Sequence, residues 1–296
     1  MKNIEIRKVQ STEFDVITRL IVDQNKNPAT HCIQSDTGAD YDGVRQEISN
    51  LAARSEVCFV AAFQANQLVG ILGCELDEEM GRGWVRGPFV LAVDGDWDNL
   101  ASVLLQELLS ILPPAVRCLD SFLNIANEQG NRFYLAHEFQ QLRLVHVYIA
   151  LPPEKSFTRC PLCQTLPPAY SQEFVALHNT IFLQTYATGE RILDKLDDDH
   201  QVFVFIRGGA LLGYLYAVID EEAQEGLVDF LGVRAAARGQ GIGRQLLQTA
   251  LYWFFEVKKM PQAGLVVNDD LTNARSLYEK VGFKLKYTGV HTRKAW

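Results

Sequence analysis

The chain repeats an ordered set of residues at a spacing of about 144 positions, which predicts two copies of one fold. Asn124 lies ten positions before Tyr134, and Asn268 lies ten positions before Tyr278, so each residue is 144 positions from its match. Further matches at spacings of 142 to 144 join Phe59 with Phe203, Gly70 with Gly213, Val90 with Val233, and Leu104 with Leu246. Short insertions or deletions in loops would produce this difference of two residues in the spacing.

A proline-rich stretch over residues 151–168 separates the two copies, because prolines interrupt regular elements. We therefore expect two domains, 1–150 and 151–296. Each reads as an α/β fold with a mixed sheet, and Arg207-Gly-Gly-Ala210 predicts a hairpin turn. In the second half the patterns predict helices near 170–185 and 188–197, strands 201–207, 210–220 and 225–233, helix 242–257, strand 263–268, helix 271–281 and strands 283–295.

The composition is that of a globular protein, with 296 residues, 48% hydrophobic and 22% charged. No apolar run reaches the ~18–20 residues of a membrane span, and the first residues lack the apolar core of a signal peptide, so we expect a cytoplasmic location. The six cysteines mostly lie in apolar runs and are expected to be reduced. Cys160 and Cys163 have ligand spacing without a second pair, so no metal is expected.

The stretch Arg238-Gly-Gln-Gly-Ile-Gly-Arg244 lies between a predicted strand and a predicted amphipathic helix. Glycines let a backbone approach a ligand closely, and the positive end of a helix attracts anions. The stretch therefore suits a pyrophosphate, although a tight turn alone also explains the glycines. It lacks the Gly-Lys-Ser/Thr ending of a P-loop and the spacing of the dinucleotide fingerprint.

The same loop resembles the acyl-CoA pyrophosphate loop of the GNAT superfamily of N-acetyltransferases, Arg/Gln-x-x-Gly-x-Gly/Ala, at Arg238, Gly241 and Gly243. The resemblance implies two tandem GNAT-like domains and acetyl-CoA as co-substrate. It also implies that the acyl-CoA lies in a gap between two splayed strands, here 226–233 and 263–268. We expect Gly232 to mark the bulge that spreads these strands. The residues expected to bind it are Leu231, Gly232, Val233, Arg238, Gly239, Gln240, Gly241, Ile242, Gly243, Arg244, Asn268 and Asn273.

The first half has lost the corresponding loop. Alignment of the two copies places Asp96 opposite Arg238, and Trp97 and Asn99 opposite the glycines at 239 and 241. Negative charge and bulky side chains oppose a pyrophosphate there. We expect this degenerate first domain to bind no CoA in the usual way, to support the second domain and to line part of the acceptor cleft.

Two residues are candidates for proton transfer. The resemblance implies that Tyr278 protonates the departing thiolate, whereas its position in a helical apolar stripe also fits plain packing. The family often has Asn where Leu271 stands, and Asn273 is a possible substitute. Asp229 is the first candidate for the base that takes the amine proton, because strand alternation places it with Leu231 and Val233. An exposed strand-end acid is the alternative.

These observations predict an N-acetyltransferase that moves an acetyl group from acetyl-CoA to an amine by direct attack in a ternary complex. The net charge of −8 argues against nucleic acid as the main partner and favours a cationic acceptor. We expect no membrane partner. A non-enzymatic acyl-CoA sensor or interaction module is the alternative from another class, and a protein acetyltransferase differs only in its acceptor.

Overall fold

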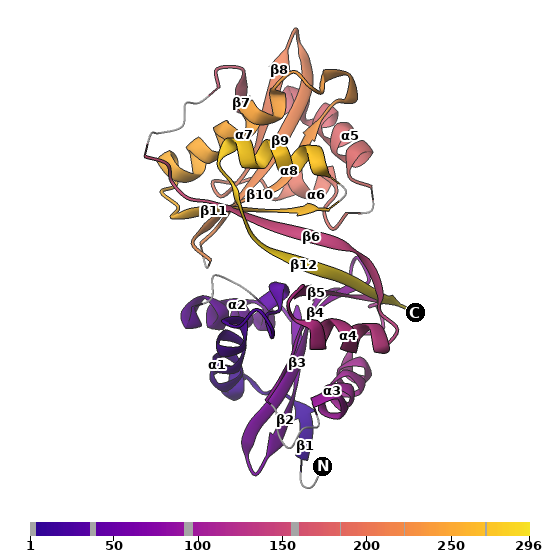
Figure 1. The fold of residues 1–296 in the computed structure, drawn as a ribbon. Coiled ribbons are helices and arrows are strands. Elements are labelled where there is room, and N and C mark those ends of the chain that lie inside the picture. Colours follow the sequence, from indigo (N-terminus) through magenta and orange to yellow (C-terminus); the bar gives the residue numbers. More distant parts are fainter. Residues whose placement is uncertain are drawn as a thin grey trace. The chain divides into compact units, whose positions relative to one another are not determined.

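The computed structural model describes residues 4–35, 40–91, 97–154, 160–183, 185–221, 223–269 and 271–296, except for the side chains at 272 and 273. The chain divides into two compact units (Figure 1). Unit 1 comprises Met1–Val145 and Thr288–Trp296, and unit 2 comprises His146–Tyr287. Each unit combines helices with a sheet of parallel and antiparallel strands, as the sequence predicts. No helix in these described ranges is long and apolar enough to cross a membrane.

The predicted domain bounds need two corrections. Unit 2 begins at His146 and not at residue 151. The last nine residues, which the prediction assigned to the second domain, belong to unit 1. The reason is strand pairing, because the C-terminal strand runs antiparallel to β5 from Gly289 opposite Asn124 to Ala295 opposite Cys118. A composition change along the chain marks a linker but does not reveal which sheet accepts a later strand.

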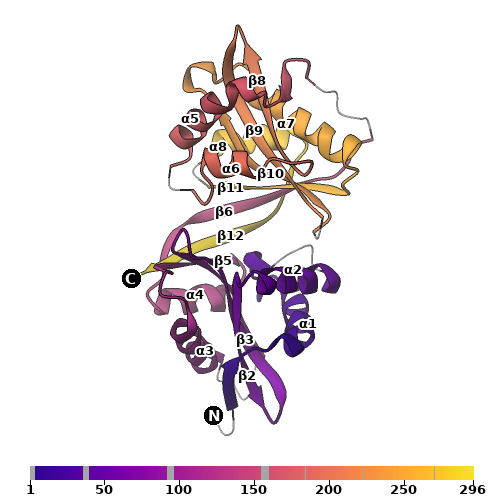
Figure 2. The ribbon, with the colours of Figure 1, turned by 180° about the vertical axis from the view of Figure 1, so that it is seen from behind.

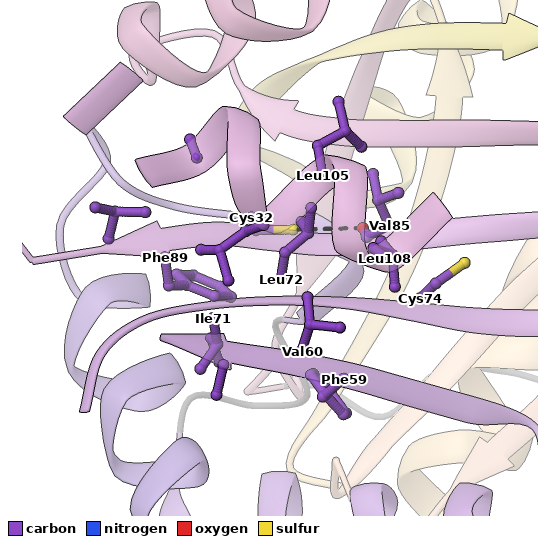
Figure 3. Packing of buried hydrophobic residues seen from close by; sticks show 14 of the residues in the cluster. Cys32, Phe59, Val60, Ile71, Leu72, Cys74, Val85, Phe89, Leu105 and Leu108 are labelled. Carbon is purple, nitrogen blue, oxygen red and sulfur yellow. Dashed lines mark hydrogen bonds between the residues drawn. The ribbon is translucent and has the colours of Figure 1, made fainter. Parts of the chain in front are cut away.

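Unit 1 contains strands in the order β1-β2-β3-β4-β5-β12, with parallel pairing between β4 and β5. Its core packs around α1, α2 and α3, and Figure 3 shows part of it. The elements are β1 Ile4–Lys8, η1 Ser11–Glu13, α1 Phe14–Asn25, η2 Ile33–Ser35, α2 Tyr41–Ala53, β2 Val57–Gln64, β3 Gln67–Asp77, β4 Arg82–Val90, α3 Trp97–Ile111, β5 Cys118–Asn124 and α4 Glu128–Ala136.

Two long strands, β6 (Gln140–Ala150) and β12 (Lys284–Ala295), begin in one unit and end in the other. In unit 1, a charge cluster fixes β12 to β5. Asp120 is fully buried and accepts hydrogen bonds from Arg82, His291 and Arg293. These three donors hold the pKa of Asp120 well below its usual range despite burial. Loss of any donor leaves a buried charge less compensated.

Unit 2 has strands in the order β6-β11-β10-β9-β8-β7. Helices α7 and α8 cover one face of the sheet (Figure 1), and α5 and α6 cover the other (Figure 2). The elements are β7 Cys163–Thr165, η3 Pro168–Tyr170, α5 Ser171–Ile181, α6 Gly189–Asp194, β8 His200–Arg207, β9 Ala210–Asp220, β10 Glu225–Val233, η4 Ala235–Ala237, α7 Ile242–Tyr252, the π turn Trp253–Val257, β11 Gln262–Asn268 and α8 Thr272–Val281.

The repeat is visible in the element bounds. Strand β4 spans residues 82–90 and β10 spans 225–233, which is an offset of 143 at both ends. Strands β5 and β11 end 144 positions apart, at Asn124 and Asn268. The predicted hairpin is confirmed, since Gly208 and Gly209 both adopt positive φ between β8 and β9. Residues that match across the repeat therefore occupy equivalent positions in the two sheets.

Candidate active site

The glycine-rich loop of unit 2 is built around two left-handed residues. Gly239 and Gly241 both have φ of +76°, a conformation that L side chains rarely adopt. A Cβ at Gly239 would meet nothing within 4 Å, and one at Gly241 only the end of Gln245 at 3.9 Å. The backbone is thus open to solvent at the positions where the sequence predicts a phosphate contact. The third glycine has another role, because a Cβ at Gly243 would lie 3.0 Å from Leu277 of α8.

Helix α7 begins directly after this loop, with Gly241 as its N-cap. The first N–H groups of a helix have no partner within it, and the helix dipole makes this end positive. The first turn of α7 carries no acidic side chain, and Arg238 and Arg244 flank it exposed to solvent. Gln240 accepts a hydrogen bond from Arg207, which adds a third arginine. Together these groups suit a polyanion such as a pyrophosphate.

Strands β10 and β11 separate beyond their first half. They pair in parallel only over Glu225–Val228 and Gln262–Leu265, although β10 continues to Val233 and β11 to Asn268. Leu231 and Val233 are half-buried, so the strand edge beside this gap stays partly accessible. Main-chain groups along the unpaired half of β10 are therefore available to a ligand that enters between the strands.

A β-bulge at Asp229 corrects two predictions. The register between β10 and β9 shifts between Val228 and Phe230, so the bulge lies at Asp229 and not at Gly232. A bulge adds one residue and reverses the alternation of side chains beyond it. Leu231 consequently packs with the α7 side, whereas Asp229 bonds to Tyr186 beside the α5 and α6 side. The expectation that Asp229 shares a face with Leu231 and Val233 is wrong for this reason.

Asp229 is a carboxylate with a raised pKa. Burial raises the pKa of its side chain to about 6, while the Tyr186 hydroxyl, which donates to Oδ1, works in the opposite direction. The nearby charges of Lys195 and His200 also favour the ionised form. A carboxylate with this pKa is ionised above pH 6 and still holds a proton well. The electrostatics suit a general base.

Tyr278 lies on α8 against the other face of the sheet. Its side chain is 8% exposed, and burial raises its pKa to about 12, so the phenol is protonated at neutral pH. Among the described residues its hydroxyl has no hydrogen-bond partner. Its counterpart in unit 1, Tyr134, is fully buried and donates to the carbonyl of Gly87 at 2.8 Å. Only the second copy therefore keeps a phenol proton available for another acceptor.

The geometry can be compared with known proteins. Residues 166–283 match the model of the acetyltransferase (GNAT) family. The chain carries a GNAT acetyltransferase domain. This domain lies within unit 2 and contains the glycine loop, the gap between β10 and β11, Asp229 and Tyr278.

Two curated relatives are mycothiol acetyltransferases. The one from Streptomyces avermitilis is 34% identical over 91 residues, which is 31% of this chain and 29% of that protein. The one from Streptomyces griseus subsp. griseus is 31% identical over 86 residues, or 29% of this chain and 28% of that protein. The match thus spans less than a third of either relative.

Solved structures show the same fold over the whole chain. A GCN5-related N-acetyltransferase from Sphaerobacter thermophilus superposes with a TM-score of 0.75 at 17% identity, covering 100% of this chain and 96% of that one. A tandem GNAT protein from the clavulanic acid biosynthesis pathway gives 0.61 at 12% identity, covering 99% and 98%. At these identities the likeness concerns the fold alone. It supports the tandem GNAT architecture that the repeat predicts.

The remaining predicted residues of the GNAT domain are placed less directly. Asn268 is half-buried at the end of β11, and its carbonyl accepts a hydrogen bond from the backbone N–H of Leu271. Asn273 belongs to the first turn of α8, and its side chain lies outside the described part of the chain. Asp96 in the first copy also lies outside it, whereas Trp97 begins α3.

The sequence analysis missed two features of the GNAT domain, which are Tyr186 and the hydrogen bonds of His178. His178 is fully buried, as expected for a packed residue, but both of its ring nitrogens are bonded. Nε2 donates to the carbonyl of Ala187 at 2.9 Å, and Nδ1 accepts from the Tyr214 hydroxyl at 2.6 Å. Burial lowers the pKa of His178, so the ring is neutral. No spacing or composition signal distinguishes these residues from core packing.

The equivalent gap in unit 1 is filled by the protein itself. Strands β4 and β5 pair only over Arg82–Trp84 and Cys118–Asp120. Cys32, next to η2, forms a β-bridge with Leu123, and its Sγ accepts from the N–H of Gly87 at 3.3 Å. Figure 3 shows Cys32 beside Val85 of β4. The segment 31–35 therefore contacts both splayed strands, and we call it the filling segment.

Proposed function

We propose that the GNAT domain transfers the acetyl group of acetyl-CoA to an amine. The observation that carries this proposal is the difference between the two matched tyrosines. The Tyr278 hydroxyl has no partner among the described residues, whereas that of Tyr134 is bonded to Gly87. A phenol used only for packing would have no reason to differ in this way. The open glycines at 239 and 241 supply the second requirement, a place for the pyrophosphate.

The two faces of the sheet suggest how the step proceeds in a ternary complex. Tyr278 and the N-terminus of α7 lie on one face, and Asp229 approaches from the other. We propose that the thioester enters the gap between β10 and β11, where a backbone N–H of Leu231–Val233 stabilises the oxyanion. The amine nitrogen forms its bond to the carbonyl carbon and loses a proton to Asp229. The carbon–sulfur bond breaks, and the thiolate takes its proton from Tyr278.

Single hydroxyl deletions at the matched tyrosines test this mechanism. Tyr278→Phe is expected to lower kcat about 100-fold because the leaving thiolate loses its proton donor, with the Kd for acetyl-CoA unchanged. Tyr134→Phe is the matched control and is expected to leave kcat unchanged. Steady-state rates and calorimetric titration of both variants measure this. A Tyr278→Phe enzyme that transfers acetyl groups at the normal rate would favour an acyl-CoA-binding sensor instead.

We propose that unit 1 binds no acyl-CoA, because the filling segment occupies the gap that an acyl chain would enter. The residues of β4 from Val85 to Val90 are all buried, whereas their counterparts in β10 alternate between buried and half-buried. Titration of the full chain with acetyl-CoA should therefore give one equivalent. Two equivalents would show that a ligand displaces the filling segment.

The acceptor is proposed to be a cationic amine. The chain as a whole has a net charge of −8, which favours the approach of a cation. Because two relatives are named mycothiol acetyltransferases, a mycothiol-related amine belongs in the first screen. Acetylation rates for cationic and neutral amines of similar size test the charge preference. Faster transfer to the neutral amines would contradict it.

A further inference from the structure

The loop between α5 and α6 places the hydroxyl of Tyr186 next to Asp229. Tyr186 donates its phenol proton to Oδ1 of Asp229, and its ring lies 5.3 Å from the ring of Phe230. Tyr186 keeps 42% of its surface exposed, so the loop covers the carboxylate from the solvent side. Among the described residues this is the one hydrogen bond recorded for the Asp229 side chain.

Four polar contacts hold this loop, and the two made by His178 are buried. His178 donates to the carbonyl of Ala187, the residue directly after Tyr186. Arg191 donates to the carbonyl of Tyr186 at 3.1 Å, and Asn179 accepts from the N–H of Gly189 at 2.8 Å. His178 is in turn oriented by Tyr214, whose hydroxyl donates to Nδ1. The two buried bonds of His178 favour one conformation of the loop, because breaking either would leave a buried polar group unpaired.

We propose that Tyr186 is a positioning residue for Asp229, and that His178 acts through Ala187 to hold Tyr186 in place. The proposal rests on the proposed role of Asp229 as the base. The Tyr186 hydroxyl orients one carboxylate oxygen and stabilises its charge, which leaves the second oxygen for the amine proton. Hydrogen bonding to the charged form of an acid favours that form.

Other groups around Asp229 determine how large this effect is. Lys195 and His200 favour the ionised form of Asp229. The negative charge of Asp229 in turn helps to raise the pKa values of the Tyr214 and Tyr216 phenols. Burial of Asp229 favours its protonated form and so acts against the charges of Lys195 and His200. Without the Tyr186 hydroxyl, burial is less compensated and the pKa of Asp229 rises above 6. More of the carboxylate is then protonated at neutral pH and unable to accept a proton.

The test is a titration of the Asp229 carboxyl carbon by ¹³C NMR in the full chain, with Asp229→Asn to assign the signal. Tyr186→Phe is expected to raise the pKa of Asp229 by about one unit. Tyr170→Phe is the matched control, because the Tyr170 hydroxyl bonds to the carbonyl of Gly209 elsewhere in unit 2. His178→Phe removes the bond to Ala187 and is expected to shift the pKa in the same direction.

Kinetics separate positioning from general damage. In Tyr186→Phe the loss of kcat/KM should be about fivefold near pH 6 and should largely disappear by pH 8, because the carboxylate is then ionised again. A loss that is equal at every pH overturns the proposal, as does an unshifted Asp229 titration in Tyr186→Phe. Because Tyr186 is a half-exposed loop residue, its variant decides the matter even where His178→Phe fails to fold. The NMR titration needs no acetyl transfer, so it stands or falls separately from the proposed function.

Discussion

Each unit has a bulged strand that separates from its parallel neighbour, but a pair of matched charged residues on these two strands differs between the units. Arg86 in unit 1 and Asp229 in unit 2 are 143 positions apart, at equivalent points of β4 and β10. Arg86 is 1% exposed and forms ion pairs with Glu47 and Glu75 at 2.6 and 2.9 Å. Among the described residues the hydrogen-bond donor to Asp229 is a neutral hydroxyl, and the pKa of Asp229 is raised. Arg86 is thus compensated by two ion pairs, whereas Asp229, the bulged residue of β10, has a raised pKa.

The connection between the first two α-helices of each unit also differs between unit 1 and unit 2. In unit 1 the connection between α1 and α2 is long enough for the filling segment to bridge β5 and reach Gly87. In unit 2 the connection between α5 and α6 runs only from residue 182 to 188, and it presents Tyr186 to Asp229. The two copies of the fold, a closed one in unit 1 and an accessible one in unit 2, thus differ in loop length and in the sign of one matched charge.

The sharpest way to break this comparison is Asp229→Asn. Acetyl transfer is expected to fall by about 10²–10⁴-fold, because the amine loses its proton acceptor. Stability at pH 7 should be equal or slightly higher. The raised pKa means that the folded protein disfavours the charged form, so ionisation of Asp229 lowers stability as the pH rises through about 4 to 6. Rates and urea unfolding at pH 7 check both statements, and a stability loss without a rate loss would make Asp229 a structural residue.

The opposite result is expected for Arg86→Met. Glu47 and Glu75 would face each other without their shared cation, which should cost about 3 kcal/mol of stability in unit 1. Acetyl-CoA affinity should stay unchanged, because the proposed binding groups lie in unit 2. Native-state hydrogen exchange of β4 amides, with β10 amides as the internal reference, measures the local loss. Weaker acetyl-CoA binding in this variant would mean that unit 1 contributes to the ligand site.

A somewhat smaller effect is expected for Asp120→Asn. The substitution removes the charge that Arg82, His291 and Arg293 share, at a cost of about 2–3 kcal/mol. The folded pKa of Asp120 is lowered, so its contribution is present above pH 4 and is lost as the pH falls through the folded pKa. The difference in free energy of unfolding between the parent and the variant should therefore be smaller at pH 3 than at pH 7. A constant difference at both pH values would point to packing and not to charge.

The smallest expected effect tests the glycine loop. Gly239→Ala places a Cβ at a φ of +76°, which costs about 1–2 kcal/mol, and it should weaken acetyl-CoA binding about tenfold. Gly208→Ala is the matched control, because it has a φ of +61° in an equally open hairpin turn. Both variants should lose similar stability, and only the first should lose affinity in calorimetric titrations. Equal affinities would remove the loop from the binding site.

The sequence predicts the positions of helices and strands better than it predicts how they pair and which side chains meet. Hydrophobic periodicity and the repeat locate β8–β11, α7 and α8 within a few residues, because these patterns are local. The face of Asp229 was predicted wrongly because a single bulged residue inverts strand alternation. The filling segment, Tyr186 and the β5–β12 pairing depend on contacts between distant parts of the chain. Such contacts carry no local signal in one sequence.

The pairing of β12 with β5 also has a consequence for biosynthesis. The chain leaves unit 1 after Val145 and returns to it at Thr288, so unit 2 is inserted within unit 1. On the ribosome, every residue of unit 2 is made before the last strand of unit 1 exists. Until then Asp120 lacks two of its three partners, His291 and Arg293. The accessible copy is therefore ready to fold before the closed copy can be completed.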